Sequence, residues 1–432
     1  MRDSAGDAAG DAVAVADGGS AARYRRVRAL TEDLAAPLSA EDQAVQSMPD
    51  CSPAKWHRAH TTWFFETFLL GPFLPGYRPF DPDYAYLFNS YYEAVGARHP
   101  RPQRGMITRP GVAEVTAYRA HVDAAMERLL ECADERAGPL LDLGLAHEEQ
   151  HQELILMDLL HLFSLNPLNP VYRPAEPDPV NSGPGKGRWL TFDGGVRLIG
   201  HDRAGFAFDN EGPRHQALLQ PFRLFSRPVA NADWLAFIAD GGYRTPTLWL
   251  ADGWAAVQAQ GWNAPGYWRR GDDDRSGGWR VMTLAGERPV EADAPVCHVS
   301  FYEADAFARW AGKRLPTEAE WEVAAAGLPV AGNTLGRGAL RPRPGPAGTD
   351  AAPAQMFGDV WEWTASPYGR YPGYRPAAGA VGEYNGKFMA NQMVLRGGCC
   401  VTPDGHVRAS YRNFFYPHQR WMFAGLRLAE DA

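Results

Sequence analysis

A stretch crowded with proline, asparagine and glycine divides this chain into two parts. It reads NPLNPVYRPAEPDPVNSGPGKGR and covers residues 166–188. This composition is typical of a semi-extended linker, because it favours neither a helix nor a strand. A single core rarely grows beyond about 300 residues, so a chain of 432 residues is expected to form two domains. We therefore place the domain boundary in this stretch.

The part before the linker, residues 23–165, is predicted to be helical. Four long segments carry apolar residues at helical spacing, which favours an antiparallel four-helix bundle. Ser52 and Pro53 are expected to begin the second helix, with Ser52 as its N-cap, and Gly71-Pro72 to end it. The four segments are RYRRVRALTEDLAAPL, SPAKWHRAHTTWFFETFLL, RPGVAEVTAYRAHVDAAMERLLECA and GPLLDLGLAHEEQHQELILMDLLHLF.

The part after the linker, residues 189–432, has a different pattern. Short strand-like runs alternate with loops rich in glycine and aromatic residues, and the runs are VRLIGHD, FRLFSRPV, VCHVSFYEA, MVLRGGCCV and GLRLA. Two stretches look helical, NADWLAFIADGG and TEAEWEVAAAG, and in the second Thr317 and Glu320 predict a capping box. We therefore expect an α+β fold class, with a helical domain followed by a largely irregular α+β domain.

Charge and composition exclude several classes of function. The formal net charge of -8 argues against a surface that binds nucleic acid or anionic lipid. No run of about eighteen apolar residues predicts a membrane span. Residues 1–22, rich in Ala, Gly and Asp, are interpreted as a disordered tail rather than a secretory signal. The five cysteines, without C-x-x-C spacing, favour free thiols in a reducing compartment, so we expect a cytoplasmic protein.

The most specific chemical signal is the segment HEEQH, in which His147 and His151 stand four residues apart with Glu148 beside the first. On a helix this spacing places two imidazoles on one face, with Cβ atoms about 6 Å apart. Histidine nitrogens bind iron, zinc, copper or nickel, so two histidines alone do not select the metal.

A third ligand is expected from another helix. His60, in KWHRAHTTWFF, is favoured, because Trp63 and Phe64 at the next turns suit a position facing the bundle interior. His57 competes with it, since it lies one turn earlier on nearly the same face.

H-E-x-x-H is also the signature of zinc proteases, in which Glu148 would act as general base. Zinc proteases need a further ligand at a set distance. The metzincins have Gly and His at the positions where this chain has Leu154 and Met157. A gluzincin would need a glutamate on a following helix, but Glu176, the available glutamate, lies in the proline-rich linker. A third interpretation is that the two histidines only pack or form hydrogen bonds.

Three stretches resemble one family. KWHRAHTTWFFETFLL, HEEQHQELILMD and the block EYNGKFMANQMVLRGGCC…RASYRNFFYPHQRWMFAGLRLA are together similar to the sulfoxide synthases of ergothioneine biosynthesis, which are non-haem iron enzymes. The resemblance implies a DinB-like four-helix bundle over residues 23–165. It implies a formylglycine-generating-enzyme-like domain, related to C-type lectin domains, over residues 189–432, where PVCHVSFYEADAFARWAGKRLPTEAEWEVAAAG and MFGDVWEWTASPY carry it.

The resemblance also implies an activity and a cofactor. Fe(II) would be held by His60, His147 and His151, which agrees with the pattern of the residues. The family joins the thiol of cysteine or γ-glutamylcysteine to C2 of the imidazole of hercynine, Nα-trimethylhistidine, with O2 as oxidant. A non-catalytic ligand-binding module remains an alternative, because the second domain is related to lectins.

Proton delivery and substrate binding are expected from residues that match the family's positions. Tyr91 or Tyr92, in the loop between the second and third helices, is the expected acid, with Tyr371 and Tyr374 as substitutes.

The substrate-binding residues come from three stretches. Arginine forks suit the carboxylates of the thiol substrate, and aromatic faces suit the quaternary ammonium of hercynine. Cys399 and Cys400 are not expected to bind copper, because neighbours on a strand point in opposite directions. The expected substrate-binding residues are Arg101, Arg104, Gln150, Trp421 and Phe423.

Overall fold

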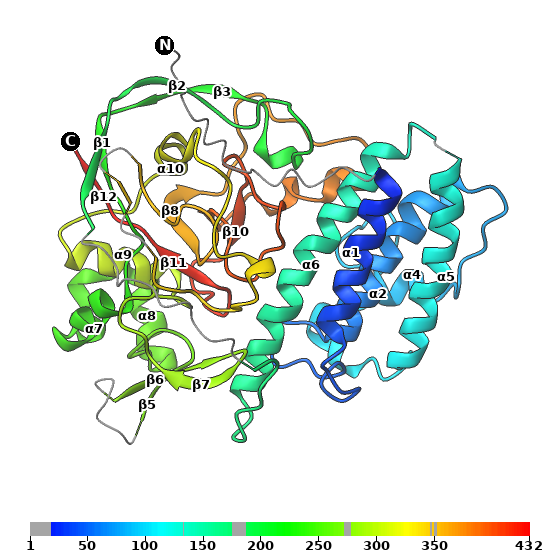
Figure 1. The fold of residues 1–432 in the computed structure, drawn as a ribbon, viewed down its shortest axis with the longest axis horizontal. Coiled ribbons are helices and arrows are strands. Elements are labelled where there is room, and N and C mark those ends of the chain that lie inside the picture. Colours follow the sequence, from blue (N-terminus) through cyan, green and yellow to red (C-terminus); the bar gives the residue numbers. More distant parts are fainter. Residues whose placement is uncertain (1–18, 133, 175–186, 272–277, 346–347, 350–351) are drawn as a thin grey trace, which may run out of the picture.

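The chain folds into a helical bundle and a second, mixed domain that lie side by side, with one long helix between them (Figure 1). The structure is a computed structural model, and it describes residues 19–432 except 133, 175–186, 272–277, 346–347 and 350–351. Among these residues no helix is both long and apolar enough to cross a membrane.

Four long helices form the bundle, as the spacing of apolar residues predicts. Helix α2 packs against both α5 and α6, and α1 packs against α6. The helical elements of this half are α1 (Ser20–Ala35), α2 (Ala54–Phe65), the π-helical turn η1 (Glu66–Leu70), α3 (Gly71–Phe73), α4 (Tyr84–Phe88), the short helix η2 (Arg101–Met106), α5 (Val112–Glu131) and α6 (Gly138–Ser164).

Both predicted ends of the second helix are wrong. Pro53 is the N-cap of α2, and no side chain caps the helix. Ser52 makes tertiary contacts instead: its backbone N–H donates to Asp158 Oδ2 at 2.8 Å, and its hydroxyl accepts from Arg104 at 3.0 Å. The helical stretch also runs past Gly71-Pro72, since α3 follows η1 directly and ends at Phe73.

Several small sheets, four α-helices and short 3-10 turns make up the described part of the second domain. The strands that form the four-stranded sheet, in the order β10-β9-β8-β11, pair antiparallel except for β8 and β11. They are β8 (Trp361–Pro367), β9 (Met393–Arg396), β10 (Asn413–Phe415) and β11 (Ala424–Leu426). In a second sheet β4 (Phe222–Phe225) pairs with both β1 (Trp189–Phe192) and β12 (Ala429–Asp431). In a third, β6 (Trp279–Thr283) pairs with both β5 (Trp268–Arg270) and β7 (Gly286–Pro289), and β2 (Gly195–Ile199) pairs with β3 (His215–Leu219).

The helices of this domain are α7 (Asn231–Ala239), α8 (Ala251–Gln260), α9 (Phe301–Trp310) and α10 (Glu318–Ala325). The predicted capping box at the start of α10 is confirmed. Thr317 Oγ1 accepts from the backbone N–H of Glu320 at 3.2 Å, and the Glu320 carboxylate accepts from the N–H of Thr317 at 2.7 Å.

Four of the five predicted strand-like runs contain a strand, and VCHVSFYEA does not. Its last residues begin α9, which Ser300 caps through its side chain. Strand β9 ends at Arg396, so Cys399 and Cys400 lie beyond it in a turn rather than on a strand. Both thiols are buried, and all five cysteines are free.

The predicted tail and linker lie partly outside the described residues, which exclude 1–18 and 175–186. Helix α1 begins at Ser20, inside the stretch interpreted as tail. The first part of the linker packs against both domains. Tyr172 is buried, its hydroxyl donates to the carbonyl of Leu34 at 2.7 Å, and its N–H donates to the carbonyl of Leu284 at 2.9 Å.

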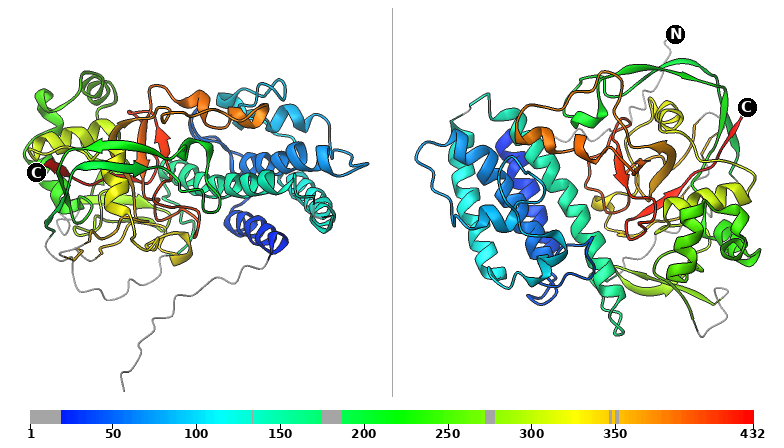
Figure 2. Two further views of the ribbon diagram at one scale, coloured as in Figure 1. Left: turned by 90° about the horizontal axis from the view of Figure 1, so that it is seen from above. Right: turned by 180° about the vertical axis from the view of Figure 1, so that it is seen from behind.

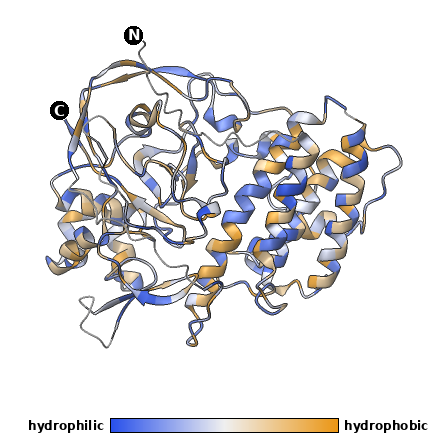
Figure 3. Ribbon diagram, viewed as in Figure 1, coloured by the Kyte–Doolittle hydropathy of each residue, from blue (hydrophilic) through white to orange (hydrophobic). Residues whose placement is uncertain are grey.

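Helix α6 belongs to both domains. It lies between the bundle and the second domain in the front and back views (Figures 1 and 2). Hydrophilic residues fill its middle, and hydrophobic ones dominate the turns that follow (Figure 3). Polar side chains in the middle of a buried helix need partners, so this part of α6 is where a site is expected.

Candidate metal centre

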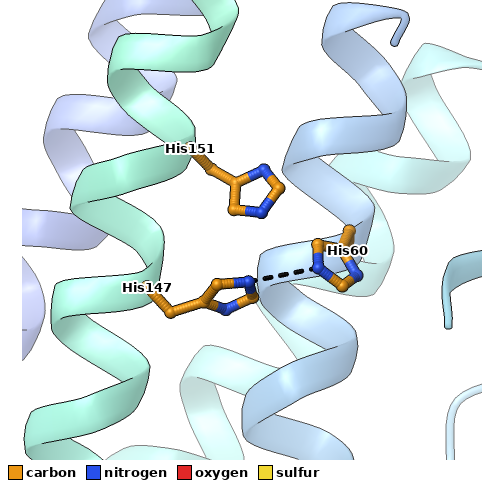
Figure 4. A group of neighbouring side chains, drawn as sticks. All are labelled: His60, His147 and His151. Carbon is orange, nitrogen blue, oxygen red and sulfur yellow. Dashed lines mark hydrogen bonds between the residues drawn. The ribbon is translucent and has the colours of Figure 1, made fainter. Parts of the chain in front are cut away.

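Three histidines converge from two helices of the bundle (Figure 4). His60 comes from α2, and His147 and His151 come from α6. Their ligand nitrogens all lie within 4.8 Å of one another, and no other group of three or more potential metal ligands occurs among the described residues. Nε2 of His60 lies 3.2 Å from Nε2 of His147. The i, i+4 spacing therefore directs both α6 imidazoles towards α2.

All three imidazoles favour the neutral form, which is the form that binds metals. Burial lowers the pKa of His60 and of His151 well below the ordinary value, and the neighbouring imidazole of His147 lowers both further. Burial lowers the pKa of His147 to about 3. At pH 7 the site thus offers three uncharged nitrogen donors.

The hydrogen bonds around the site fit a metal ion. His60 Nδ1 lies 2.6 Å from the carbonyl of Phe88, which can only accept, so Nδ1 carries the hydrogen and Nε2 has its lone pair free. His147 Nδ1 is buried without a hydrogen-bond partner among the described residues. Ligating histidines commonly donate their second N–H to an acceptor, as His60 does to the carbonyl of Phe88. A set of three imidazoles suits Fe(II), zinc or copper.

Glu148 of the H-E-x-x-H pattern faces away from the three histidines. Arg28 donates to its Oε2 at 2.8 Å, and Arg119 donates to its Oε1 at 3.0 Å. Thr31 also donates to Oε1, at 2.7 Å. Both oxygens are therefore engaged in the bundle interior, where Glu148 cannot hold a water molecule for hydrolysis. The geometry disfavours the zinc-protease hypothesis.

The structure separates the two arginines proposed to bind the thiol substrate. Arg104 is buried, and its guanidinium carbon lies 3.4 Å from the centre of the Trp56 ring. The Trp56 ring also stacks on His60 at 4.6 Å. Arg104 donates to the hydroxyls of Ser52 and Ser90, and no described carboxylate forms an ion pair with it. Arg101 is exposed, and its guanidinium donates to the backbone carbonyl of Asp50.

Gln150 reaches from α6 to two tyrosines of the second domain. Its Nε2 donates to the hydroxyl of Tyr411 at 2.7 Å, and its Oε1 accepts from the hydroxyl of Tyr384. The ring of Tyr384 lies 5.6 Å from that of His147. A pocket of about 480 Å³ at the domain boundary is lined by Tyr384. Sequence reasoning missed this tyrosine, although it stands in the quoted segment EYNGKFMANQ.

Tyr91 and Tyr92, the tyrosines of the loop between α2 and α5, lie next to each other and farther from the three histidines than Tyr384. The Tyr91 and Tyr92 rings are 4.6 Å apart, and Tyr91 lies 6.2 Å from Tyr384. Tyr92 is buried against Phe68 at 5.1 Å. Tyr371 and Tyr374, the alternative candidates for the acid, lie elsewhere in the second domain. The hydroxyl of Tyr371 donates to Glu318, and that of Tyr374 donates to Asp209.

The two aromatic residues near the C-terminal end have different surroundings. The indole N–H of Trp421 donates to Asp158 Oδ1 at 3.0 Å, so Trp421 contacts α6 about two turns beyond His151. Phe423 packs against His298 at 4.7 Å and lines a separate small cavity with Cys297. The structure therefore does not bring Phe423 to the three histidines.

Comparison with known proteins covers both domains. The DinB superfamily model matches residues 23–155, and the sulfatase-modifying factor enzyme 1-like domain matches residues 175–338 and 351–432. The formylglycine-generating enzyme of Streptomyces coelicolor is 31% identical over 316 residues, which are 60% of this chain and 94% of that protein.

Relatives that match over almost the whole length include two mycobacterial hercynine oxygenases. The hercynine oxygenase of Mycolicibacterium smegmatis is 35% identical over 415 residues, covering 89% of this chain and 92% of that protein. The hercynine oxygenase of Mycobacterium tuberculosis is 34% identical over 438 residues, covering 95% and 97%. With the bundle, the second domain and the buried histidine triad all in place, the chain belongs to the hercynine oxygenase family.

Proposed function

We propose that this protein is an oxygen-dependent sulfoxide synthase, which joins the sulfur of cysteine or γ-glutamylcysteine to C2 of the hercynine imidazole. The C–S bond replaces the S–H and C2–H bonds. One oxygen atom of O2 goes to sulfur, and the other leaves as water with the two hydrogens. The observation that carries the proposal is the neutral histidine triad in a chain that matches hercynine oxygenases over nearly its full length.

We propose Fe(II) as the metal and His60, His147 and His151 as its ligands. Bound Fe(II) would activate oxygen and offer open coordination positions for oxygen and the thiolate, while the two substrates supply the electrons that reduce O2. Neutral imidazoles leave the positive charge of the ion uncompensated, which favours an anionic thiolate beside it. The side chain of Glu148, turned into the bundle, does not compete for these positions.

Arg104 is proposed to bind a carboxylate of the thiol substrate. It is a buried cation held by two hydroxyls, and its Nε has no hydrogen-bond partner among the described residues. A guanidinium in this state gains a charge-assisted hydrogen bond when a carboxylate arrives. Gln150 and Trp421 are proposed to contact hercynine, because both project from the boundary of the two domains.

We infer that Tyr384 is the proton donor, because its ring lies 5.6 Å from the ligand His147. Tyr91 and Tyr92 are the second candidates, since the family resemblance points to their loop. Burial raises the pKa of all three phenols, so each keeps its proton at pH 7 and can donate it during oxygen reduction.

The test is an assay of the purified protein loaded with Fe(II) without oxygen. Hercynine and either thiol are then added under air, and the products are read by mass spectrometry. We expect a sulfoxide with at least one thiol, and oxygen uptake only when both substrates are present. Zinc-loaded protein is the control and should give no product. Absence of any C–S product with both thiols would contradict the proposal.

Three single variants locate the acid in the same assay. Tyr384→Phe is expected to lose most sulfoxide formation, by about 100-fold, because general-acid catalysis contributes about that much. Tyr91→Phe and Tyr92→Phe are expected to lose less than about tenfold. The reverse order would move the role to the loop.

A further inference from the structure

One metal-ligand candidate is connected to the second domain by a chain of hydrogen bonds. Nδ1 of His151 lies 2.7 Å from Nδ1 of His57, on the side of the ring opposite Nε2. His57 is buried on α2, one turn before His60. Its other nitrogen, Nε2, lies 3.1 Å from Asp158 Oδ2, and Asp158 accepts the indole N–H of Trp421.

The partners of Asp158 determine the direction of every hydrogen bond in this chain. The carboxylate accepts two N–H groups that can only donate, from the Ser52 backbone at 2.8 Å and from Trp421 at 3.0 Å. A carboxylate also accepts from His57, so Nε2 of His57 carries the hydrogen and its Nδ1 has a lone pair. His151 must then donate through Nδ1, which leaves the lone pair of its Nε2 facing the other two histidines.

The three ligand candidates differ in this support. His60 donates directly to a backbone carbonyl, and His147 Nδ1 has no partner among the described residues. Within the described part of the chain, His151 alone of the three is connected to a carboxylate by hydrogen bonds, and the connection runs through a second imidazole. A carboxylate behind a ligating histidine increases its basicity and orients its ring.

We propose that His57, Asp158 and Trp421 form a positioning relay, which holds His151 in the tautomer that binds metal through Nε2. Because Trp421 comes from the second domain, docking of that domain onto α6 contributes to metal affinity in the bundle. His57 and Asp158 are positioning residues, which act through His151, and Trp421 takes part through its indole N–H in addition to its proposed contact with hercynine. The inference rests on the proposed metal site, but the tautomer of His151 can be measured without any metal.

Two substitutions of His57 separate the relay from simple packing. His57→Leu fills a similar volume and offers no acceptor to His151, whereas His57→Gln keeps a carbonyl oxygen that can accept its Nδ1–H. Partners behind a ligand contribute about 10–100-fold to metal affinity. We expect His57→Leu to weaken Co(II) binding by about that factor, and His57→Gln to recover most of it.

A second pair of variants tests Asp158 without altering His57. In Asp158→Asn the amide NH2 must face donors on one side or the other, either Trp421 or the side of Ser52 and His57. Trp421→Phe removes one of these donors. The double variant Asp158→Asn/Trp421→Phe can therefore place its NH2 towards the phenyl ring and its oxygen towards His57. We expect the double variant to bind Co(II) more tightly than Asp158→Asn alone.

The experiment uses the full chain labelled with 15N-histidine, first metal-free and then titrated with Co(II). The 15N shifts report which ring nitrogen of His151 carries the hydrogen, and the visible absorption of Co(II) reports affinity. His161→Leu is the matched control. His161 lies on α6, as His151 does, and its side chain hydrogen-bonds to Ser47, which is outside the relay. This variant should bind Co(II) like the parent.

The outcomes separate the relay from the proposed function. Nδ1–H on His151 in the parent, lost in His57→Leu and restored in His57→Gln, would support the relay. Parental Co(II) affinity and an unchanged tautomer in His57→Leu would overturn it and leave the metal site standing. A parent that shows the Nδ1–H tautomer but binds no Co(II) would support the relay and contradict the metal site instead.

Discussion

The bundle interior and the domain boundary treat buried charge in opposite ways. In the bundle, Glu148 receives two arginines and a threonine hydroxyl. At the boundary, Glu153 lies on the same helix and is also buried, but the hydrogen bonds that it accepts from described side chains come from neutral donors. These are the indole N–H of Trp361 at 2.7 Å and the hydroxyl of Thr402 at 2.5 Å.

The pKa values of the two carboxyls respond accordingly. Burial alone would raise the pKa of Glu148, but Arg28 and Arg119 outweigh it and lower that pKa. Burial raises the pKa of Glu153, and the hydrogen bonds from Thr402 and Trp361 only partly offset it. Two glutamates on one helix therefore differ because one has cationic partners and the other does not.

Arg104 is the cationic counterpart of Glu153. Burial lowers its pKa well below the ordinary value, whereas Arg28, which is equally buried, has a raised pKa because Glu148 and Asp123 pair with it. The bundle thus pairs Glu148 with arginines, while Glu153 and Arg104 have no ionic partner of opposite formal charge among the described residues. An unpaired buried charge is costly, and a substrate of opposite charge can relieve that cost.

The largest expected effect on stability follows from breaking the buried ion pairs of Glu148 in the bundle. Glu148→Gln leaves Arg28 and Arg119 without their shared carboxylate, so we expect a loss of about 3–5 kcal/mol in the free energy of unfolding. Urea titration of the metal-free protein measures it. Glu127→Gln is the control, because its pair with Arg25 is exposed and screened by solvent, so a much smaller loss is expected. Equal losses in both variants would contradict the contrast.

Removing the unpaired cation should change binding rather than folding. Arg104→Met keeps the length of the side chain over Trp56 but removes the guanidinium. We expect KM for the thiol to rise by about 10–100-fold, because a hydrogen bond to a charged group contributes about 1.5–3 kcal/mol. KM for hercynine should stay constant. Arg101→Met, in the same short helix η2 but exposed, should change KM for the thiol by less than about threefold.

The smallest effect is expected at Glu153, and it depends on pH. Its pKa is higher in the folded protein than its ordinary value of 4.5, so the folded state binds the proton more tightly. Stability from this group is fully present below pH 4.5 and is lost as pH rises through the folded pKa. Glu153→Gln removes this loss. We expect the free energy of unfolding of the variant, relative to that of the parent, to rise by about 1 kcal/mol as pH increases, which unfolding titrations at several pH values measure. A gap that shrinks with rising pH would refute it.

Local patterns predicted much of the fold and part of the site. The spacing of apolar residues predicted four helices, and Thr317 and Glu320 predicted the start of α10, because both signals involve residues within one or two turns. The spacing of His147 and His151 likewise required a shared face. By contrast, Ser52 looked like an N-cap, but its groups are used by Asp158 and Arg104, which are distant in sequence.

The sequence by itself determined that two imidazoles of α6 point the same way and that an aromatic-rich helix offers a third. Only the tertiary structure decided between His57 and His60, since residues one turn apart share a face. His60 meets the carbonyl of Phe88 and turns its Nε2 to the site, while His57 lies between His151 and Asp158. Tyr384 and Trp421 reach α6 only because the second domain packs against it. Such contacts join residues more than 200 positions apart, and no local pattern records them.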